Sequence, residues 1–145
     1  MVDRKATTIW EGDLFSGKGS VSFDSSNAAG PLDVSWPART EAPQGMTSPE
    51  ELIAAAHASC YSMSLSNVLA KAGTPPNRLD TVAVVTAGKG EKGLGITNIV
   101  LTVRGDVPGA DAAAFEAAAQ TAKDACPVSK LVAGNVEIAL EASLA

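Results

Sequence analysis

The feature that most constrains the fold of this 145-residue chain is a run from Leu52 to Ala72 that contains neither proline nor glycine. Ser48 and Pro49 come shortly before it and suit the N-cap and the first position of a helix. Glu51 follows Ser48 at the three-residue spacing of a capping box. Gly73 and the two prolines that follow cannot continue the helix. The pattern predicts one long helix that begins near residue 49.

One face of this helix is predicted from the spacing of its apolar residues. Leu52, Ala56, Cys60 and Met63 recur at helical intervals and form a mainly apolar stripe of small residues. We therefore expect a central, buried helix with Cys60 in its middle.

Strand patterns flank the helix on both sides. Alternating or β-branched residues predict strands over 7–12, 20–24, 32–35, 80–87, 95–104 and 135–144. Asp111 caps a predicted helix over 112–125, and Pro127 begins a shorter one with Cys126 at its N-cap and Gly134 at its end. This order predicts a single α+β domain over residues 1–145, with a mainly antiparallel sheet packed on the long helix.

The glycine-rich segment 88–93 lies between two of the predicted strands. We interpret it as a hairpin connection. A phosphate-binding loop is disfavoured because the segment does not begin a helix.

Charge and hydropathy exclude several classes of protein. The chain has 11 basic and 16 acidic residues and a net charge of −5, without a basic run, so nucleic acid is not an expected partner. We find no apolar stretch near the roughly 20 residues that span a bilayer, and the first residues lack the apolar segment of a signal peptide. The expectation is a soluble, cytoplasmic protein with no membrane partner.

Cys60 and Cys126 are the two cysteines, and they are separated by 66 residues. They form no CxxC motif, and His57 as the one histidine leaves too few soft ligands for a structural metal. Two interpretations stay open: inert buried thiols, which residue type alone favours, or a reactive pair. Burial would raise the pKa of Cys60, so reactivity requires a cation, for which Arg39 and His57 are the nearby candidates. For Cys126, the N–H groups of the helix that it caps would stabilise a thiolate.

Glu50 is left free if Glu51 serves the capping box. Ten residues of helix place Glu50 and Cys60 about 15 Å apart along one axis. They can serve the same chemistry only if the helix breaks between them or if Glu50 comes from a second subunit. The sequence contains no helix breaker there, which favours a composite site in a two-fold dimer. Each residue also has a plainer interpretation: Glu50 as a favourable charge in the first helical turn, Arg39 as a surface charge and His57 as a packed polar group.

The sequence resembles a known family in several places. The run Thr47-Ser48-Pro49-Glu50-Glu51-Leu52-Ile53-Ala54-Ala55-Ala56-His57-Ala58-Ser59-Cys60 is similar to the signature helix of the OsmC/Ohr family of thiol-dependent organic hydroperoxide reductases. Ala125-Cys126-Pro127-Val128-Ser129 resembles the second cysteine motif of that family. Ile9-Trp10-Glu11-Gly12 and Arg39-Thr40-Glu41 are closer to the OsmC branch than to the Ohr branch.

The resemblance implies an OsmC-like fold, an intertwined homodimer with sites at its interface, and a peroxidase for oxidative or osmotic stress. Cys60 would be the peroxidatic cysteine that becomes a sulfenic acid, and Cys126 would resolve it as a disulfide. Arg39 would be the cation that lowers the pKa of Cys60 and orients the peroxide, and Glu50 would hold that arginine. A dithiol would restore the thiols, typically a lipoylated protein in the Ohr branch. No metal, haem or flavin cofactor is implied.

Substrate and alternatives follow from the same residues. An apolar pocket would favour organic hydroperoxides over hydrogen peroxide by burying their hydrocarbon part. The candidate lining residues are Met46, Met63, Phe23 and Trp36, although residues of these types are more often plain core packing. The alternative function is a redox-sensing or small-ligand-binding stress protein without turnover. A structural dimer with inert thiols is the third hypothesis.

Overall fold

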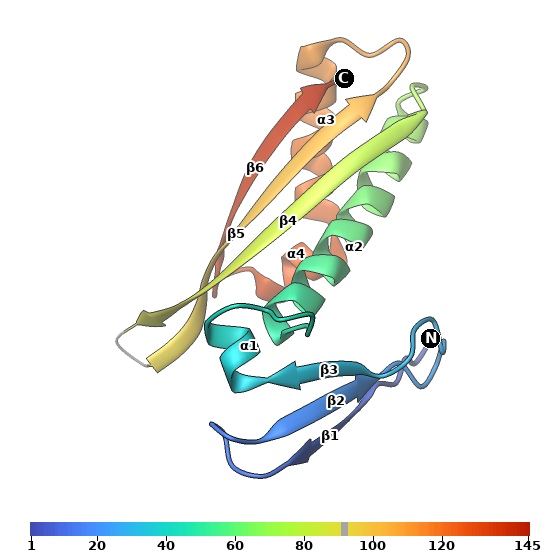
Figure 1. Cartoon of the computed structure of the whole chain (residues 1–145). Coiled ribbons are helices and arrows are strands. Elements are labelled where there is room, and N and C mark those ends of the chain that lie inside the picture. The colour runs from blue at the N-terminus through green and yellow to red at the C-terminus, as the bar shows by residue number, and fades with distance from the viewer. Residues whose placement is uncertain (91–92) are drawn as a thin grey trace. The chain divides into compact units, whose positions relative to one another are not determined.

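The computed structural model describes residues 1–90 and 93–145, and its Cα positions divide into two compact units, residues 1–52 and residues 53–145. Figure 1 shows the elements of both. Glu91 and Lys92, in the connection expected over 88–93, lie outside the described residues. The assignment of one domain to residues 1–145 stays a prediction. None of the helices described is both long enough and apolar enough to cross a membrane.

The first unit is built on a three-stranded antiparallel sheet. Its strands are β1 (Thr7–Glu11), β2 (Lys18–Ser22) and β3 (Leu32–Ser35), in that spatial order. The Trp10 ring of β1 lies against the Gly19 backbone, where an added Cβ would come within 2.8 Å of Trp10 Cε3. Glycine at this position therefore lets the indole cover the sheet.

A short helix follows β3 directly and was not expected from the sequence. α1 spans Trp36–Thr40, directly after the strand predicted over 32–35. Ser35 caps it, since its hydroxyl accepts the Ala38 N–H at 3.2 Å, and Pro37 suits the first turn. The same serine–proline signal that marks the long helix is present here, but the turn was too short to show a helical period. This helix carries Arg39.

The long helix, α2, spans Pro49–Lys71 without interruption, which confirms the prediction. The Glu51 N–H donates to the Ser48 hydroxyl at 3.1 Å, so Ser48 is a working cap. The Glu51 carboxylate, however, accepts from the Thr47 hydroxyl at 2.7 Å. The expected capping box is therefore only half formed, because Thr47 offers the carboxylate a nearer donor.

The predicted face of α2 is wrong by part of a turn. Ala56 is exposed and Met63 is 67% exposed, although both belong to the stripe expected to be buried. The buried side chains are instead those four residues apart on another face, namely His57, Tyr61, Leu65 and Leu69. Alanine and serine on all sides of the helix leave the apolar spacing ambiguous, so packing against larger side chains decides which face is buried.

The second unit contains a three-stranded mixed sheet: β4 (Arg78–Gly90), β5 (Gly93–Asp106) and β6 (Glu137–Leu144). β4 and β5 pair antiparallel, whereas β6 runs parallel to β5. Every second residue of β6 faces the core, as the alternation predicted. The α+β class with mainly antiparallel pairing is confirmed, and the one parallel pair lies between β5 and β6.

Two helices cover one face of this sheet. α2 and α3 (Ala112–Ala125) run along it side by side in Figure 1, and one cluster of buried side chains joins them to β5. The largest buried members of that cluster are Tyr61, Leu65, Leu69, Leu101, Val103 and Phe115. Asp111 caps α3 through the Ala114 N–H at 2.8 Å, as predicted. α4 (Pro127–Val132) follows at once, and Cys126 is the residue between the two helices.

Candidate active site

The two cysteines are brought together within the second unit. Cys60 lies in the middle of α2 and is half-buried, whereas Cys126 lies at the α3–α4 junction and is fully buried. Their thiols are free and close enough for each to affect the ionisation of the other. The core of α2, α3 and β5 therefore places side by side two sulfur atoms from residues far apart in the sequence.

The two thiols differ in acidity. Burial raises the pKa of Cys60; the Val128 N–H opposes this rise, and the Cys126 thiol adds to it. Burial also opposes charge on Cys126, but four nearby groups together lower its pKa below the ordinary value. They are the N–H and the hydroxyl of Ser129, the Cys60 thiol and the Val128 N–H. Within one chain, Cys126 is therefore the first of the two to become a thiolate.

A buried polar pair lies beside the thiols. His57, one turn before Cys60 on α2, is 0% exposed, and Ser129 on α4 is 5% exposed. His57 Nε2 and Ser129 Oγ are 2.8 Å apart. Burial lowers the pKa of His57, so the ring is neutral at neutral pH. His57 is one of the two cations that the sequence offers for Cys60, but a buried neutral ring does not fit that role.

Arg39 and Glu50 form an ion pair within the first unit. Arg39 Nη2 lies 2.7 Å from Glu50 Oε1, and Arg39 Nε lies 3.1 and 3.2 Å from the two carboxylate oxygens. The guanidinium carbon also lies 5.7 Å from the centre of the Trp36 ring, a cation–π distance. Burial alone would raise the pKa of Glu50, but the hydrogen bonds and charge of Arg39, with further donors at the start of α2, bring it below its usual value. Glu50 is thus ionised and holds Arg39 in one orientation.

An apolar hollow of about 460 Å³ opens beside Arg39 in the first unit. Trp36, a residue expected in a pocket lining, is part of its wall. The remaining lining is Ala6, Thr8, Trp10, Leu14, Val21, Val34, Ser35, Pro49 and Leu52. A hydrocarbon group would be removed from water here while a polar end faces the guanidinium.

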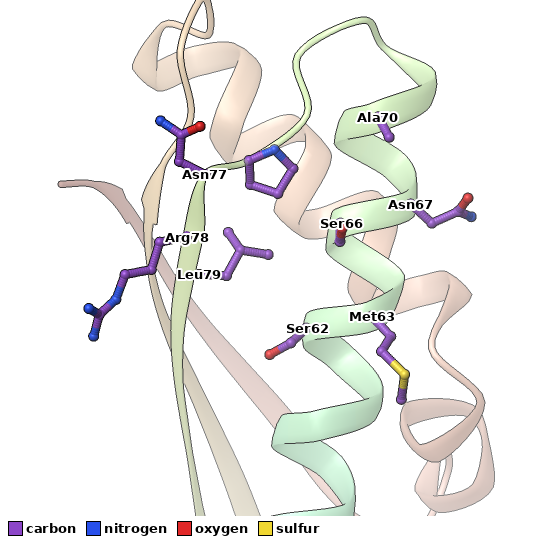
Figure 2. A pocket seen from close by; sticks show the side chains of 9 residues that line it. Ser62, Met63, Ser66, Asn67, Ala70, Asn77, Arg78 and Leu79 are labelled. Atoms are coloured by element: carbon purple, nitrogen blue, oxygen red, sulfur yellow. The ribbon is translucent and has the colours of Figure 1, made fainter.

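The other three expected lining residues lie elsewhere. Met46 lines a separate hollow beside β2 and β3, and Phe23 is half-buried just after β2. Met63 lines an open groove of about 500 Å³ between α2 and the start of β4. Figure 2 shows side chains that line this groove, the polar Ser62, Asn67 and Arg78 together with Met63 and Leu79. Its polar, open character makes it a poor binding site for a hydrocarbon.

The four predicted site residues therefore form two pairs, Arg39 with Glu50 and Cys60 with Cys126. Ser129 had no predicted role, although its place in the first helical turn after Cys126 indicates that it lies near that thiol. Within residues 1–90 and 93–145, no three histidine, cysteine, aspartate or glutamate side chains gather in a way that would hold a metal ion.

The family model described as OsmC-like protein matches residues 42–141, which include both cysteines and Glu50. The chain is also 42% identical to peroxiredoxin OsmC of Escherichia coli over 137 residues, 94% of each chain. The chain belongs to the OsmC family. The family also explains a further likeness, to the organic hydroperoxide resistance protein OhrA of Bacillus subtilis, which is 32% identical over 76% of this chain and 78% of its own length.

Solved structures agree with this family assignment. An organic hydroperoxide resistance protein from Elizabethkingia anophelis superposes with a TM-score of 0.79 at 25% identity, covering 100% of this chain and 98% of its own. The OsmC-like fold predicted from the sequence is confirmed.

Proposed function

We propose that this OsmC family member is a thiol peroxidase that reduces organic hydroperoxides in oxidative or osmotic stress. The observation that carries the proposal is the adjacency of Cys60 and Cys126, which lets one sulfur be oxidised and the other resolve it. The relatives named peroxiredoxin and organic hydroperoxide resistance protein support it.

The chemistry proceeds in three steps. The Cys60 thiolate attacks the outer peroxide oxygen, the O–O bond breaks, and the departing alkoxide takes up a proton to leave as the alcohol. Cys126 then attacks the resulting sulfenic sulfur, so that an S–S bond forms, the S–O bond breaks and hydroxide leaves as water after protonation. A dithiol, for which a lipoylated protein is one chemical candidate, reduces the disulfide by exchange and is itself oxidised.

The first step requires a cation beside Cys60, whose pKa in one chain is raised by burial and by Cys126. We assign this role to Arg39 of a second subunit in a homodimer. Glu50 and Cys60 are ten residues apart in the uninterrupted α2, about 15 Å along its axis, so the arginine held by Glu50 suits the thiol of a partner better than that of its own chain. The apolar residues that β1 exposes, Ile9 and Trp10, are consistent with a covered surface in such a dimer.

The hollow beside Arg39 accounts for the preference for organic peroxides in this proposal. Its walls would bury the alkyl group, while the guanidinium faces the peroxide oxygens. Hydrogen peroxide has no hydrocarbon to bury and gains only the polar contact, so it should be the weaker substrate.

The test of the activity is consumption of cumene hydroperoxide by the purified protein with dithiothreitol as reductant. Many turnovers are expected from the wild type and none from Cys60→Ser. One oxidation equivalent per chain without further cycles would instead support a redox sensor, and full turnover by Cys60→Ser would refute the assignment. Replacing dithiothreitol with a lipoylated carrier tests the choice of reductant.

Substrate preference is tested with Leu14→Asp, because Leu14 lines the hollow and is already 48% exposed. The variant should lose roughly ten-fold in kcat/KM for cumene hydroperoxide and little for hydrogen peroxide. Val2→Asp, an exposed apolar residue outside the lining, is the matched control. Equal losses on both peroxides would argue against a role for the hollow.

A further inference from the structure

The buried pair of His57 and Ser129 has no part in the mechanism proposed above, yet it lies beside the thiols. The 2.8 Å contact between His57 Nε2 and Ser129 Oγ joins α2 to α4 across the core. Burying an imidazole and a hydroxyl costs free energy that only their hydrogen bonds offset. The pair therefore calls for an explanation beyond filling space.

The second ring nitrogen fixes the direction of the hydrogen bond. Among the described residues, His57 Nδ1 is buried and has no hydrogen-bond partner. A buried orphan N–H is rarer in proteins than an under-satisfied acceptor, so Nδ1 is the unprotonated nitrogen and Nε2 carries the hydrogen. His57 Nε2–H consequently donates to the Ser129 oxygen, and the Ser129 hydroxyl hydrogen is left to point elsewhere.

Ser129 lies in the first turn of α4, three residues after Cys126, which places its hydroxyl on the same turn as the Cys126 sulfur; the neutral thiol itself accepts no capping hydrogen bond there. Ser129 acts on Cys126 through both its N–H and its hydroxyl, and each stabilises the thiolate. The neighbouring Tyr61 hydroxyl is already used, since it donates to the Ala119 carbonyl oxygen at 3.2 Å. In the opposite tautomer, His57 Nε2 would accept the Ser129 hydroxyl hydrogen, and Cys126 would lose this donor.

We propose that His57 is a positioning residue for Cys126: its Nε2–H holds the Ser129 hydroxyl as a donor to the Cys126 thiolate. This rests on the proposed function, in which Cys126 attacks the Cys60 sulfenic acid. The hydrogen-bond chain would increase the thiolate fraction of Cys126 and so the rate of that step, in which the S–S bond forms and hydroxide leaves as water. α2 then has a second role, because this one helix carries both the oxidised sulfur and the residue that prepares the resolving sulfur.

The direct test follows the titration of Cys126 by the ultraviolet absorbance of its thiolate, in a Cys60→Ser background that removes the other thiol. Among the described residues, two titratable groups are then linked to Cys126: Tyr61, whose pKa Cys126 raises, and His57, which contacts Ser129. Ser129 itself does not titrate. Ser129→Ala should raise the measured pKa of Cys126 by about one pH unit, roughly a ten-fold loss of thiolate at neutral pH. His57→Leu should raise it by roughly half as much, and in combination with Ser129→Ala it should add nothing.

His57→Gln is the matched control, because its terminal amide can still donate to the Ser129 oxygen. The Cys126 pKa should stay within a few tenths of the wild-type value. An equal rise in the Gln and Leu variants, or no rise in Ser129→Ala, would overturn the proposal. Thermal unfolding of each variant separates loss of fold from loss of the donor.

NMR of the wild-type protein tests the tautomer of His57 without relying on a variant that must fold. His57 is the one histidine of the chain, so its ¹⁵N NMR shifts are assigned without ambiguity. The proposal expects a neutral ring protonated at Nε2, and an Nδ1–H tautomer or an imidazolium at neutral pH would contradict it. Neither readout depends on peroxide turnover, so failure of this inference is distinct from failure of the proposed function.

Discussion

Arg39 and Glu50 meet side-on, with the guanidinium Nε and Nη2 both directed at one carboxylate and the shortest contact at 2.7 Å. Glu50 is only 9% exposed, so its carboxylate is largely shielded from bulk water at the start of α2, whereas the Arg39 side chain is 31% exposed. Two parallel N–H···O bonds fix the orientation of a guanidinium, which a single contact cannot do. Glu50 therefore fixes the direction in which the Arg39 guanidinium points.

Glu50→Gln should lower kcat/KM for cumene hydroperoxide by roughly ten- to hundred-fold, because Arg39 loses its charged partner and its fixed direction. Glu51→Gln is the control on the same helical turn, since the Glu51 carboxylate bonds the Thr47 hydroxyl and not Arg39. Steady-state assays with dithiothreitol compare the two. Similar activities for both variants and the wild type would show that the carboxylate does not position Arg39 for catalysis.

The Glu50 carboxylate should also make stability depend on pH. The pKa of Glu50 is lowered in the folded chain, because Arg39 outweighs the opposing effect of burial. The carboxylate therefore contributes its full stability above the unfolded pKa of about 4.3. That contribution is lost as the pH falls through the lower pKa of the folded state. Urea unfolding at neutral pH and near pH 3 measures the difference. The wild type should lose more stability on acidification than Glu50→Gln does. Equal losses would mean that the pair contributes nothing to folding.

The composite site predicts recovery of activity in mixed dimers. Subunits carrying Glu50→Ala and subunits carrying Cys60→Ser, co-expressed with different tags and purified as heterodimers, should regain about half of the wild-type activity, since one of two sites is intact. Each variant alone should be nearly inactive. Heterodimers as inactive as their parents would place Arg39, Glu50 and Cys60 of one site on one chain.

Packing between α3 and β5 predicts a costly glycine substitution in the second unit. A Cβ added at Gly105 would lie 2.6 Å from Phe115 Cε2, inside van der Waals contact with a fully buried ring. Gly105→Ala should destabilise the fold by about 1–3 kcal/mol in urea unfolding. Gly88→Ala in the same sheet, whose Cβ would meet Thr97 Cγ2 at an ordinary 3.5 Å, should cost much less. Equal losses would mean that Phe115 moves aside freely.

Local signals in the sequence predicted most of the elements. The caps Ser48 and Asp111 placed the starts of α2 and α3, because each side chain satisfies an N–H within three residues of itself. Glu50 contacts Arg39, whereas the Glu51 carboxylate bonds Thr47 and does not complete the expected capping box. These features depend on neighbours close in the sequence.

Features that depend on distant residues were missed. The buried face of α2 is decided by Leu101 and Phe115, which the helical spacing does not include. The contact between His57 and Ser129 spans 72 residues, and neither residue type reveals its partner. The family resemblance paired Cys60 with Cys126, but which thiol is more acidic depends on the N–H groups of α4.

That difference in acidity leads to the most direct test of the central claim, that Cys60 is the sulfur that meets the peroxide. Each single cysteine variant is treated with one equivalent of cumene hydroperoxide and a dimedone probe, and the sulfenic acid is located by mass spectrometry. The account predicts labelling of Cys60 in Cys126→Ser, little labelling in Cys60→Ser, and a Cys60–Cys126 disulfide in the wild type. Rapid labelling of Cys126 in Cys60→Ser, with Cys60 unlabelled in Cys126→Ser, would contradict it.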